Sequence, residues 1–362
     1  MSEFTIEIRK VSRVYNHNNA DLLELCNVED LDFQFVVRKD VLKEGDLVLH
    51  FPLASIIPDN ILMKIGLSGK LSGASKNRVK TVRLRSALSQ GLVIPLDDML
   101  EFLPEDYQVG VDYREILGVE KYDPDEEATI SGRSQDPRLR SLPQFLFKYD
   151  IEGADNHKHI AELLMDEPVI ITEKLEGSNY PLAFEYTYEG PRIIVNSRKH
   201  SIIELENEPP HVFIELAKEK YNEVLIKVKE LLKPVHNITI WGEIIGPKVQ
   251  GNIYKLTENE VRFFDIYMDG RFVDAERKFD IFDSIGENLT VPILNRGVMT
   301  LREWLAGKSI KSASDGISIF KPELNILREG IVISPLQERH VYHFGRLILK
   351  QRSPEYLLKY DT

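Results

Sequence analysis

The sequence predicts an α+β protein in which a small N-terminal β-barrel precedes a C-terminal domain of mixed α/β structure. Three observations lead to this prediction. Short strand-like runs crowd the first part of the chain, a polar and acidic stretch with prolines follows, and strands then alternate with a long amphipathic helix. The predicted boundaries are 1–120 for the barrel domain, 121–143 for a linker and 144–362 for the second domain.

The barrel prediction rests on five short strands within roughly a hundred residues, a number that suits a small closed barrel. Each run alternates or is rich in β-branched and aromatic residues. The runs are Thr5–Ile8, Phe33–Val37, Asp46–Phe51, Thr81–Leu84 and Gly91–Ile94. A segment rich in glycine and serine, Gly66–Asn77, is expected to be a flexible loop between them.

The clearest helix of the chain is predicted over residues 209–233 in the second domain. Pro209 and Pro210 open this segment, its apolar residues recur at three- and four-residue spacing, and Pro234 ends it. Strands are expected before and after the helix, at Val169–Thr172, Ile193–Val195, Ile238–Trp241, Arg262–Tyr267, Gly330–Ile333 and Arg346–Leu349.

Composition excludes several classes of protein. The 362 residues carry a net charge of −12, with 43% hydrophobic and 29% charged residues, as in ordinary globular proteins. No apolar run approaches the roughly 18 residues of a membrane span, and the N-terminus lacks the apolar core of a signal peptide. The single cysteine, Cys26, excludes an internal disulfide and a multi-cysteine zinc site. We therefore expect an intracellular, cytoplasmic protein without a membrane partner.

The strongest chemical signal is the segment Thr172–Asn179, in which Lys174 ends a buried apolar strand and is followed by Glu176 and Gly177. Burial and neighbouring cations lower the pKa of a lysine, and only the neutral amine is a nucleophile. Gly177 allows the backbone to turn or to approach a ligand closely. Taken by itself, the segment is equally consistent with a lysine that caps a strand and a glycine in a turn.

Four later segments favour the catalytic interpretation because each places charged groups beside the end of a strand. They are Asn196–His200, Trp241–Gly246, Arg328–Ile333 and Leu347–Ser353. Together with the first segment they supply three carboxylates, an arginine and a basic pair at alternating positions. These groups are the parts that nucleotidyl transfer needs: cations for the phosphates, carboxylates for Mg²⁺, and an amine that attacks in line.

The order of these motifs resembles that of the covalent nucleotidyltransferase superfamily of ATP-dependent ligases and capping enzymes. The similarity is greatest to the RNA ligases that carry an N-terminal OB-fold domain, and it extends from Phe145 to Leu357. The resemblance implies that the barrel is OB-like and that the second domain has the nucleotidyltransferase (ATP-grasp-like ligase) fold. The family motifs fall in order on Lys174, Arg198, Glu243, Phe264, Glu329 and the pair Lys350 and Arg352.

The resemblance also implies a catalytic role for three residues. Lys174 attacks the α-phosphate of ATP and expels pyrophosphate, which leaves AMP covalently on the lysine. Lys350 and Arg352 contact that phosphate and help to lower the pKa of the lysine. The AMP then passes to an RNA 5′-phosphate, and a 3′-OH displaces it to close the strand.

Further residues are implied to hold the nucleotide or a metal ion, which is expected to be Mg²⁺ or Mn²⁺. Glu243 binds either the ribose or metal-bound water, and these alternatives stay open. The other nucleotide contacts are assigned to Glu173 through its carbonyl, to Phe264 by stacking on adenine, and to Asn179, Arg198, Glu329 and Lys350. The implied metal carboxylates are Glu176, Glu243 and Glu329.

The chain departs from the usual motifs of the superfamily in three places. Glu176 stands where Asp, His or Asn is common, Lys199 and His200 follow the motif arginine, and Arg352 stands where a lysine is common. The first and the last of these changes keep the charge but alter the reach or the geometry of the group.

A basic stretch in the barrel domain is a candidate contact for nucleic acid. Residues 76–96 hold five cations and no acidic residue, in a chain with a net charge of −12. The cations are Lys76, Arg78, Lys80, Arg83 and Arg85. An RNA-backbone surface and an ordinary solvated strand face explain this composition equally well, and the barrel context favours RNA because OB-folds commonly bind oligonucleotides.

We therefore predict an ATP-dependent RNA ligase that joins 3′-OH and 5′-phosphate ends in RNA repair, acting as a monomer on substrates such as a nicked duplex. Two alternatives stay open: a DNA ligase or GTP-using capping enzyme, and a non-catalytic RNA-binding module on the same scaffold. Capping enzymes and most DNA ligases place an OB-fold after the last motif, whereas this chain ends twelve residues beyond Lys350. Loss of catalysis commonly removes the nucleophile or the metal carboxylates, which are present here.

Overall fold

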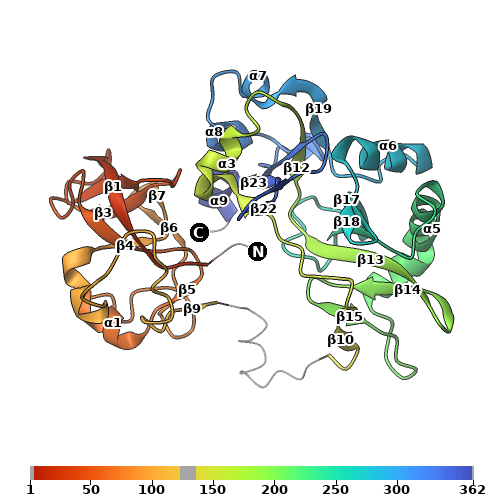
Figure 1. The fold of residues 1–362 in the computed structure, drawn as a ribbon, viewed down its shortest axis with the longest axis horizontal. Coiled ribbons are helices and arrows are strands. Elements are labelled where there is room, and N and C mark those ends of the chain that lie inside the picture. Colours follow the sequence, from red (N-terminus) through yellow and green to blue (C-terminus); the bar gives the residue numbers. More distant parts are fainter. Residues whose placement is uncertain (1–3, 123–135, 361–362) are drawn as a thin grey trace. The chain divides into compact units, whose positions relative to one another are not determined.

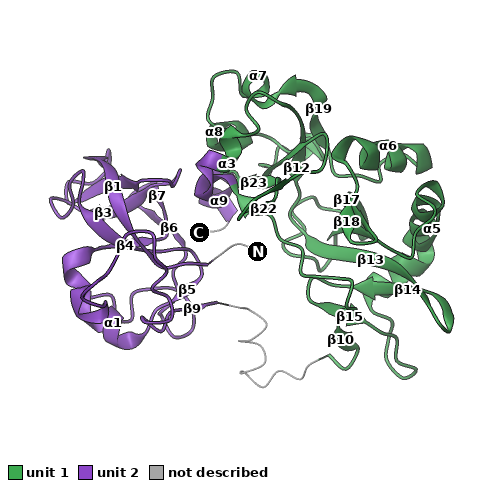
Figure 2. Ribbon diagram, viewed as in Figure 1, with its two compact units in different colours: residues 1, 134–153, 160–353 green, residues 2–133, 154–159, 354–362 purple. Residues whose placement is uncertain are grey.

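The computed structural model describes residues 4–122 and 136–360 (Figure 1). These residues form two compact units (Figure 2). The N-terminal unit consists of residues 2–133, 154–159 and 354–362, and the C-terminal unit consists mainly of 134–153 and 160–353. Residues 123–135, which make up most of the predicted linker, lie outside the described residues, so the predicted domain boundaries stay a prediction.

The N-terminal unit is built on a five-stranded antiparallel sheet that curls into a nearly closed barrel. Its strand order is β3-β2-β1-β4-β8, and the two edge strands, β3 and β8, contact each other. The bounds are β1 Glu7–Asn16, β2 Leu23–Val28, β3 Phe35–Arg38, β4 Leu47–Phe51 and β8 Leu92–Pro95. Buried side chains that include Ile8, Leu49 and Phe51 form a core in this unit. The predicted N-terminal barrel is therefore confirmed.

The strand predicted at Thr81–Leu84 is confirmed as a strand, but its place in the barrel sheet is wrong. Thr81–Leu84 is β6, which forms a separate two-stranded sheet with β7 Ala87–Gln90. The fifth barrel strand is instead β2, in which the neighbours Leu25 and Cys26 are both buried. A strand is recognised in a sequence by alternation, and two adjacent buried residues break that alternation.

Short elements complete the N-terminal unit. β5 Ser55–Ile56 pairs with β9 Glu120–Lys121. The others are α1 Asp59–Lys64, η1 Leu96–Asp98, η2 Leu100–Phe102, η3 Ala154–Asn156 and α9 Pro354–Tyr360. The predicted loop Gly66–Asn77 consists of turns and an isolated bridge at Ser72, so it is confirmed as a loop.

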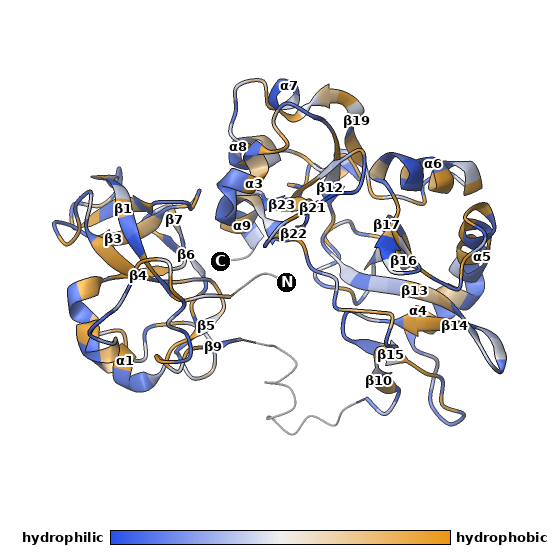
Figure 3. Ribbon diagram, in the orientation of Figure 1, coloured by the Kyte–Doolittle hydropathy of each residue, from blue (hydrophilic) through white to orange (hydrophobic). Residues whose placement is uncertain are grey.

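The C-terminal unit contains two large sheets. Many residues of its strands are hydrophobic, for example those of β14 (Figure 3). The first sheet is antiparallel, with the order β10-β15-β14-β13-β16-β17-β18. The second sheet has the order β11-β23-β20-β12-β19, and in it β11 and β23 are parallel. The first-sheet bounds are β10 Leu139–Ser141, β13 Ser178–Thr187, β14 Gly190–Asn196, β15 His200–Ile202, β16 Asn237–Ile245, β17 Glu260–Met268 and β18 Arg271–Phe272. The second-sheet bounds are β11 Glu152–Gly153, β12 Pro168–Lys174, β19 Ile293–Thr300, β20 Gly330–Pro335 and β23 Leu349–Arg352.

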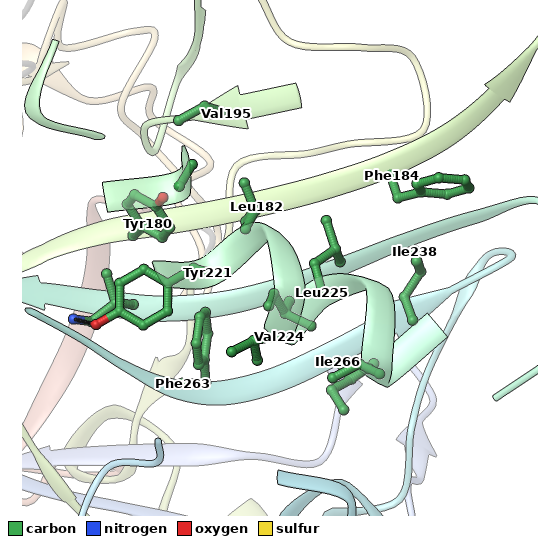
Figure 4. Close-up of a cluster of buried hydrophobic side chains, with 14 of the residues drawn as sticks. Tyr180, Leu182, Phe184, Val195, Tyr221, Val224, Leu225, Ile238, Phe263 and Ile266 are labelled. Atoms are coloured by element: carbon green, nitrogen blue, oxygen red, sulfur yellow. Dashed lines mark hydrogen bonds between the residues drawn. The ribbon is translucent and has the colours of Figure 1, made fainter. Parts of the chain in front are cut away.

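The helix predicted over residues 209–233 is confirmed as a helical segment from Val212 to Leu231. It consists of α4 Val212–Leu216, a π-helical turn η4 Ala217–Tyr221 and α5 Asn222–Leu231. Together with α6 Ala275–Ile285, it covers one face of the first sheet. Figure 4 shows Leu225 of α5 close to sheet residues such as Leu182 and Ile238. The predicted mixed α/β fold of the second domain is thus confirmed.

Smaller elements connect the strands of the second sheet. A two-stranded sheet of β21 His340–Val341 and β22 Gly345–Arg346 lies between β20 and β23 in the sequence. The short helices are α3 Lys158–Glu162, α7 Leu301–Leu305, α8 Ile310–Ser314 and η5 Pro322–Leu324.

The strand predicted at Arg346–Leu349 is shifted along the chain. β23 begins at Leu349, so Lys350 and Arg352 lie within the strand rather than after it. Arg346 belongs to β22 and forms an ion pair with the buried Asp265. Leu347 and Ile348 are buried between the two strands, which explains why hydrophobicity alone placed the strand too early.

The face of the first sheet that turns away from its helices carries a hydrophobic cluster around Trp241 and, beside it, polar residues. Tyr180 and Leu182 of β13 point into the helix-covered core, so Asn179, the neighbour of Tyr180, points to the opposite face. Ile244 of β16 also points into that core, which places Glu243 on the opposite face. Asn179 and Glu243 are paired across the two strands and therefore lie side by side.

Candidate active site

Lys174 is the last residue of β12, a central strand of the second sheet whose residues Val169–Glu173 are all buried. Its ammonium Nζ lies 2.6 Å from Oε2 of Glu329, and the lysine side chain is 27% exposed while the glutamate side chain is 10% exposed. Glu329 directly precedes β20, and Lys174 pairs with Gly330 at the start of that strand. The predicted nucleophile is therefore partly buried and held beside a carboxylate.

Gly177 allows β13 and β16 to approach each other directly after Lys174. A Cβ atom on Gly177 would lie 2.4 Å from the carbonyl oxygen of Ile244 and 2.8 Å from Cγ of Glu243. Such distances are too short for any side chain, so the position requires glycine. This close approach brings Glu243 to the region of Lys174.

Glu243 and Asn179 show the electrostatics of this region. The pKa of Glu243 is raised to about 8, chiefly by burial and also by the charge of Glu329, while Lys174 and Arg198 act in the opposite direction. The amide oxygen Oδ1 of Asn179 is buried and has no hydrogen-bond partner in the described part of the chain. A buried polar atom without a partner is a place where a ligand can bind.

The basic pair of β23 lies close to Lys174 and Glu329. Lys350 and Arg352 occupy alternating, partly exposed positions of the strand, and Arg352 Nε is 3.5 Å from Oε1 of Glu329. Burial lowers the pKa of Lys350, and the charges of Lys174 and Arg198 lower it further. The structure thus brings together Lys174, Glu329 and both predicted phosphate-binding cations.

Asp150 is a residue of this region that the sequence analysis missed. Its Oδ1 lies 3.1 Å from Nζ of Lys350, and its Oδ2 lies 3.1 Å from Nη2 of Arg198. The sequence shows an apolar and aromatic run that ends at this acidic residue, but its two partners are distant in the chain. Only the folded chain reveals the contact.

Glu173 has a side-chain contact that the resemblance did not imply. Its carboxylate is buried and accepts hydrogen bonds from the Ser318 hydroxyl and from the Ile319 backbone amide, the latter at 2.8 Å. Burial raises the pKa of Glu173, and these hydrogen bonds oppose the rise. The side chain therefore fixes the segment around Ser318, while the predicted contact through the backbone carbonyl stays a prediction.

Phe264 is half-buried where two hydrophobic clusters of the C-terminal unit meet. Its ring lies 5.3 Å from the ring of Tyr149, at an angle of 58°. The ring is thus supported on one side by another aromatic residue. Its predicted stacking on adenine stays a prediction.

Glu176 lies against the segment that follows β16. Its backbone amide donates a hydrogen bond of 2.9 Å to the hydroxyl of Tyr254, and Gln250 Nε2 donates one of 3.4 Å to the carbonyl of Gly177.

Among the described residues, no group of three or more His, Cys, Asp or Glu side chains is arranged to hold a metal ion. Mg²⁺ is commonly held by one or two carboxylates together with waters and substrate phosphates. The electrostatically coupled pair Glu243 and Glu329 fits such a shared site.

The predicted RNA-binding residues lie in the N-terminal unit, around β6. Lys76, Lys80, Arg83 and Arg85 are exposed. Arg78 is partly buried instead, with its guanidinium 3.9 Å from the centre of the Tyr122 ring. This cation–π contact makes Arg78 part of the fold of the unit, and the other four cations remain accessible to a ligand.

The fold and the site together define a class of protein: an OB-type barrel joined to a nucleotidyltransferase domain. A profile of the RNA ligase family matches residues 167–352, just over half of the chain. A profile of an OB-fold domain matches residues 5–96. The chain belongs to the RNA ligase family.

Solved structures of an RNA ligase from Naegleria gruberi resemble the whole chain. The structure with PPi is 26% identical, with a TM-score of 0.73, and the match covers 99% of each chain. A variant solved with AMP and Mn has the same identity and coverage and a TM-score of 0.74. A second variant, with ATP and Mn, is 27% identical over 99% of this chain and 100% of that chain, with a TM-score of 0.73.

These ligands, ATP, AMP and Mn, agree with the cofactors expected from the sequence. A comparison with curated proteins found no match. Within residues 4–122 and 136–360, the helices are too short or too polar to cross a membrane.

Proposed function

We propose that this protein is an ATP-dependent RNA ligase that joins 3′-OH and 5′-phosphate ends through a lysyl-AMP intermediate and an adenylylated 5′ end. The observation that carries the proposal is the position of Lys174, whose amine lies 2.6 Å from Glu329 in a partly buried site lined by cations from two sheets. The ATP, AMP and Mn in structures of the similar Naegleria ligase support it.

The first step forms a bond between Nζ of Lys174 and the α-phosphorus of ATP and breaks the bond to the β-phosphate, so pyrophosphate leaves with the electron pair. The ammonium must lose a proton before the attack. Glu329 is placed to accept this proton, because its Oε2 is already hydrogen-bonded to Nζ. Lys350, Arg352 and Arg198 stabilise the charge on the phosphates. A metal ion held at Glu243 and Glu329 would neutralise further phosphate charge.

The second and third steps act on RNA. The AMP passes from the lysine to a 5′-phosphate, and a 3′-OH then attacks this activated phosphate and releases AMP. We infer that the exposed cations around β6 bind the RNA backbone, because OB-fold barrels commonly bind oligonucleotides. We further propose a nicked duplex as the substrate, RNA repair as the role, a monomer as the active form and the cytoplasm as the location.

Labelling with [α-³²P]ATP tests the first step. The protein is first incubated with pyrophosphate to remove any bound AMP, and then with labelled ATP and Mg²⁺ or Mn²⁺. We expect a covalent label on the wild type and no label on Lys174→Ala. The matched control is Lys227→Ala, which removes an exposed lysine of α5 in the same unit and should leave labelling unchanged. A wild type that takes no label would refute the proposal.

The same assay separates the alternatives. Labelling by GTP instead of ATP would indicate a capping-type enzyme, and sealing of DNA nicks in preference to RNA nicks would indicate a DNA ligase. Tight RNA binding without any labelling would indicate a non-catalytic RNA-binding module. A panel of nicks with RNA or DNA on each side identifies the preferred substrate.

A further inference from the structure

Asp150 joins two cations of the candidate active site that come from different sheets. It precedes β11, which runs parallel to β23 with Gly153 paired to Lys350. Lys350 is carried by β23 in the second sheet, whereas Arg198 lies between β14 and β15 of the first sheet. Both cations lie 3.1 Å from oxygens of the Asp150 carboxylate. They therefore converge on one position that is occupied by an anion.

This arrangement differs from an ordinary structural ion pair. The side chains of Asp150, Lys350 and Arg198 are 29%, 32% and 48% exposed, so all three are accessible to a ligand from solution. Ion pairs with this exposure contribute little to stability. Two cations that meet at one anion are instead the arrangement by which proteins bind phosphate.

The charges around Asp150 show why a carboxylate is needed there. The three cations of this region, Lys350, Arg198 and Lys174, repel one another. Asp150 raises the pKa of Lys350, whereas the positive charges of Lys174 and Arg198 lower it. In turn, Lys350 and Arg198 hold the pKa of Asp150 below its usual value, although burial opposes this. Without Asp150, repulsion would separate Lys350 from Arg198 before a nucleotide arrives.

We infer that Asp150 is a positioning residue that holds Lys350 and Arg198 together at the phosphate position before ATP binds. The inference rests on the proposed function, because it takes the nucleotide phosphates to be the anion that later uses both cations. Asp150 thereby lowers the free energy needed to bring the two cations together when ATP binds. A bound phosphate draws the two cations together by itself, so the contribution of Asp150 is greatest for ATP binding and smaller for the chemical step.

The test uses the full chain with Asp150→Asn, which keeps the shape of the side chain but removes its charge. We expect the KM for ATP in single-turnover labelling to rise about tenfold, with the rate at saturating ATP within about threefold of wild type. The Kd for ATP measured by calorimetry without metal should rise by the same factor. Asp150→Glu should recover most of the loss, because it restores the charge.

Controls separate this inference from a structural effect and from the proposed function. Glu185→Gln removes a carboxylate that pairs with Arg192 elsewhere in the first sheet, and it should leave both constants unchanged. Melting temperatures of all variants should match the wild type. A KM and a Kd that stay unchanged or fall in Asp150→Asn overturn the inference, as does a loss that Asp150→Glu fails to recover. A wild type that binds ATP but takes no label contradicts the proposed function instead, and the Kd comparison still decides the role of Asp150.

Discussion

Removal of the charge of the buried Asp265 should strongly destabilise the C-terminal unit. Asp265 lies on β17 and is fully buried. Its partners are Lys278 of α6, whose side chain is 3% exposed, and Arg346 of β22, whose side chain is 12% exposed. Lys278 Nζ is 2.9 Å from its Oδ1, Arg346 pairs with its Oδ2, and the Tyr149 hydroxyl donates a hydrogen bond of 2.7 Å. The carboxylate thus forms ion pairs with two cations at once.

Asp265→Asn removes this charge without changing the size of the side chain. Arg346 keeps a second carboxylate, Glu338, at 2.6 and 2.8 Å, but Lys278 loses the carboxylate with which it forms its ion pair. Breaking a buried ion pair by removing one partner costs about 3–5 kcal/mol. In a unit of this size, each kcal/mol corresponds to about 2–4 °C, so the melting temperature should fall by roughly 6–20 °C.

Tryptophan fluorescence is a suitable assay because both tryptophans of the chain, Trp241 and Trp304, belong to the C-terminal unit. Trp241 is fully buried and its ring lies 5.4 Å from that of Tyr149, so its emission reports on the packing around Asp265. The double variant Asp265→Asn/Lys278→Met removes the unpaired cation and should recover a large part of the loss. A single variant that melts within 2 °C of wild type, or a double variant no more stable than the single one, would contradict this reasoning.

Three further predictions follow from individual residues. Burial lowers the pKa of His50 from 6.5 to about 3, so as the pH falls the unfolded chain binds a proton before the folded chain does. The free energy of unfolding of the N-terminal unit should therefore decrease between pH 6.5 and 3, by up to about 1.4 kcal/mol per pH unit. His50→Phe should make this decrease shallower, as measured by the rate at which the buried Cys26 thiol becomes accessible to labelling in urea. Gly177→Ala should lower the adenylylation rate about 10²-fold through displacement of Glu243, whereas Gly286→Ala, at an extended backbone position with room for a Cβ, should leave it unchanged. Reversing the charge at Arg83 and Arg85 together should weaken RNA binding and reduce its dependence on salt while leaving adenylylation intact, and an unchanged RNA affinity would argue against β6 as the RNA contact.

Much of the fold was accessible from local patterns in the sequence. The helix over residues 209–233 and the strand that ends at Lys174 were predicted because an apolar period or a continuous apolar run reflects burial directly. β13, a ten-residue strand, gave no comparable signal, since it follows the glycine of the lysine segment without a break and holds Pro181. It pairs on one side with β14, the next strand, and on the other with β16, whose residues lie far along the chain.

The candidate site shows the same division between motif residues and their partners. Lys174, Glu243, Glu329 and Lys350 were found because strand-end motifs and a family resemblance mark them. Asp150 carries no motif, and its ion pair with Lys350 spans 200 positions of the sequence. Burial of Arg78 against Tyr122 was equally hidden, because a basic stretch looks alike whether its side chains face solvent or an aromatic ring.

The order of residues along the chain determined which chemical groups this protein possesses: a lysine after a buried strand, carboxylates beside glycines, and a basic pair with a period of two. Those features are local, so they can be read without knowing where the chain turns. The tertiary structure decided which charges meet, because an ion pair depends on distance in space. The two large sheets of the C-terminal unit bring together residues that the sequence separates by more than a hundred positions. The pairing of Lys174 with Glu329, the bridge made by Asp150 and the burial of Asp265 all belong to this second kind of information.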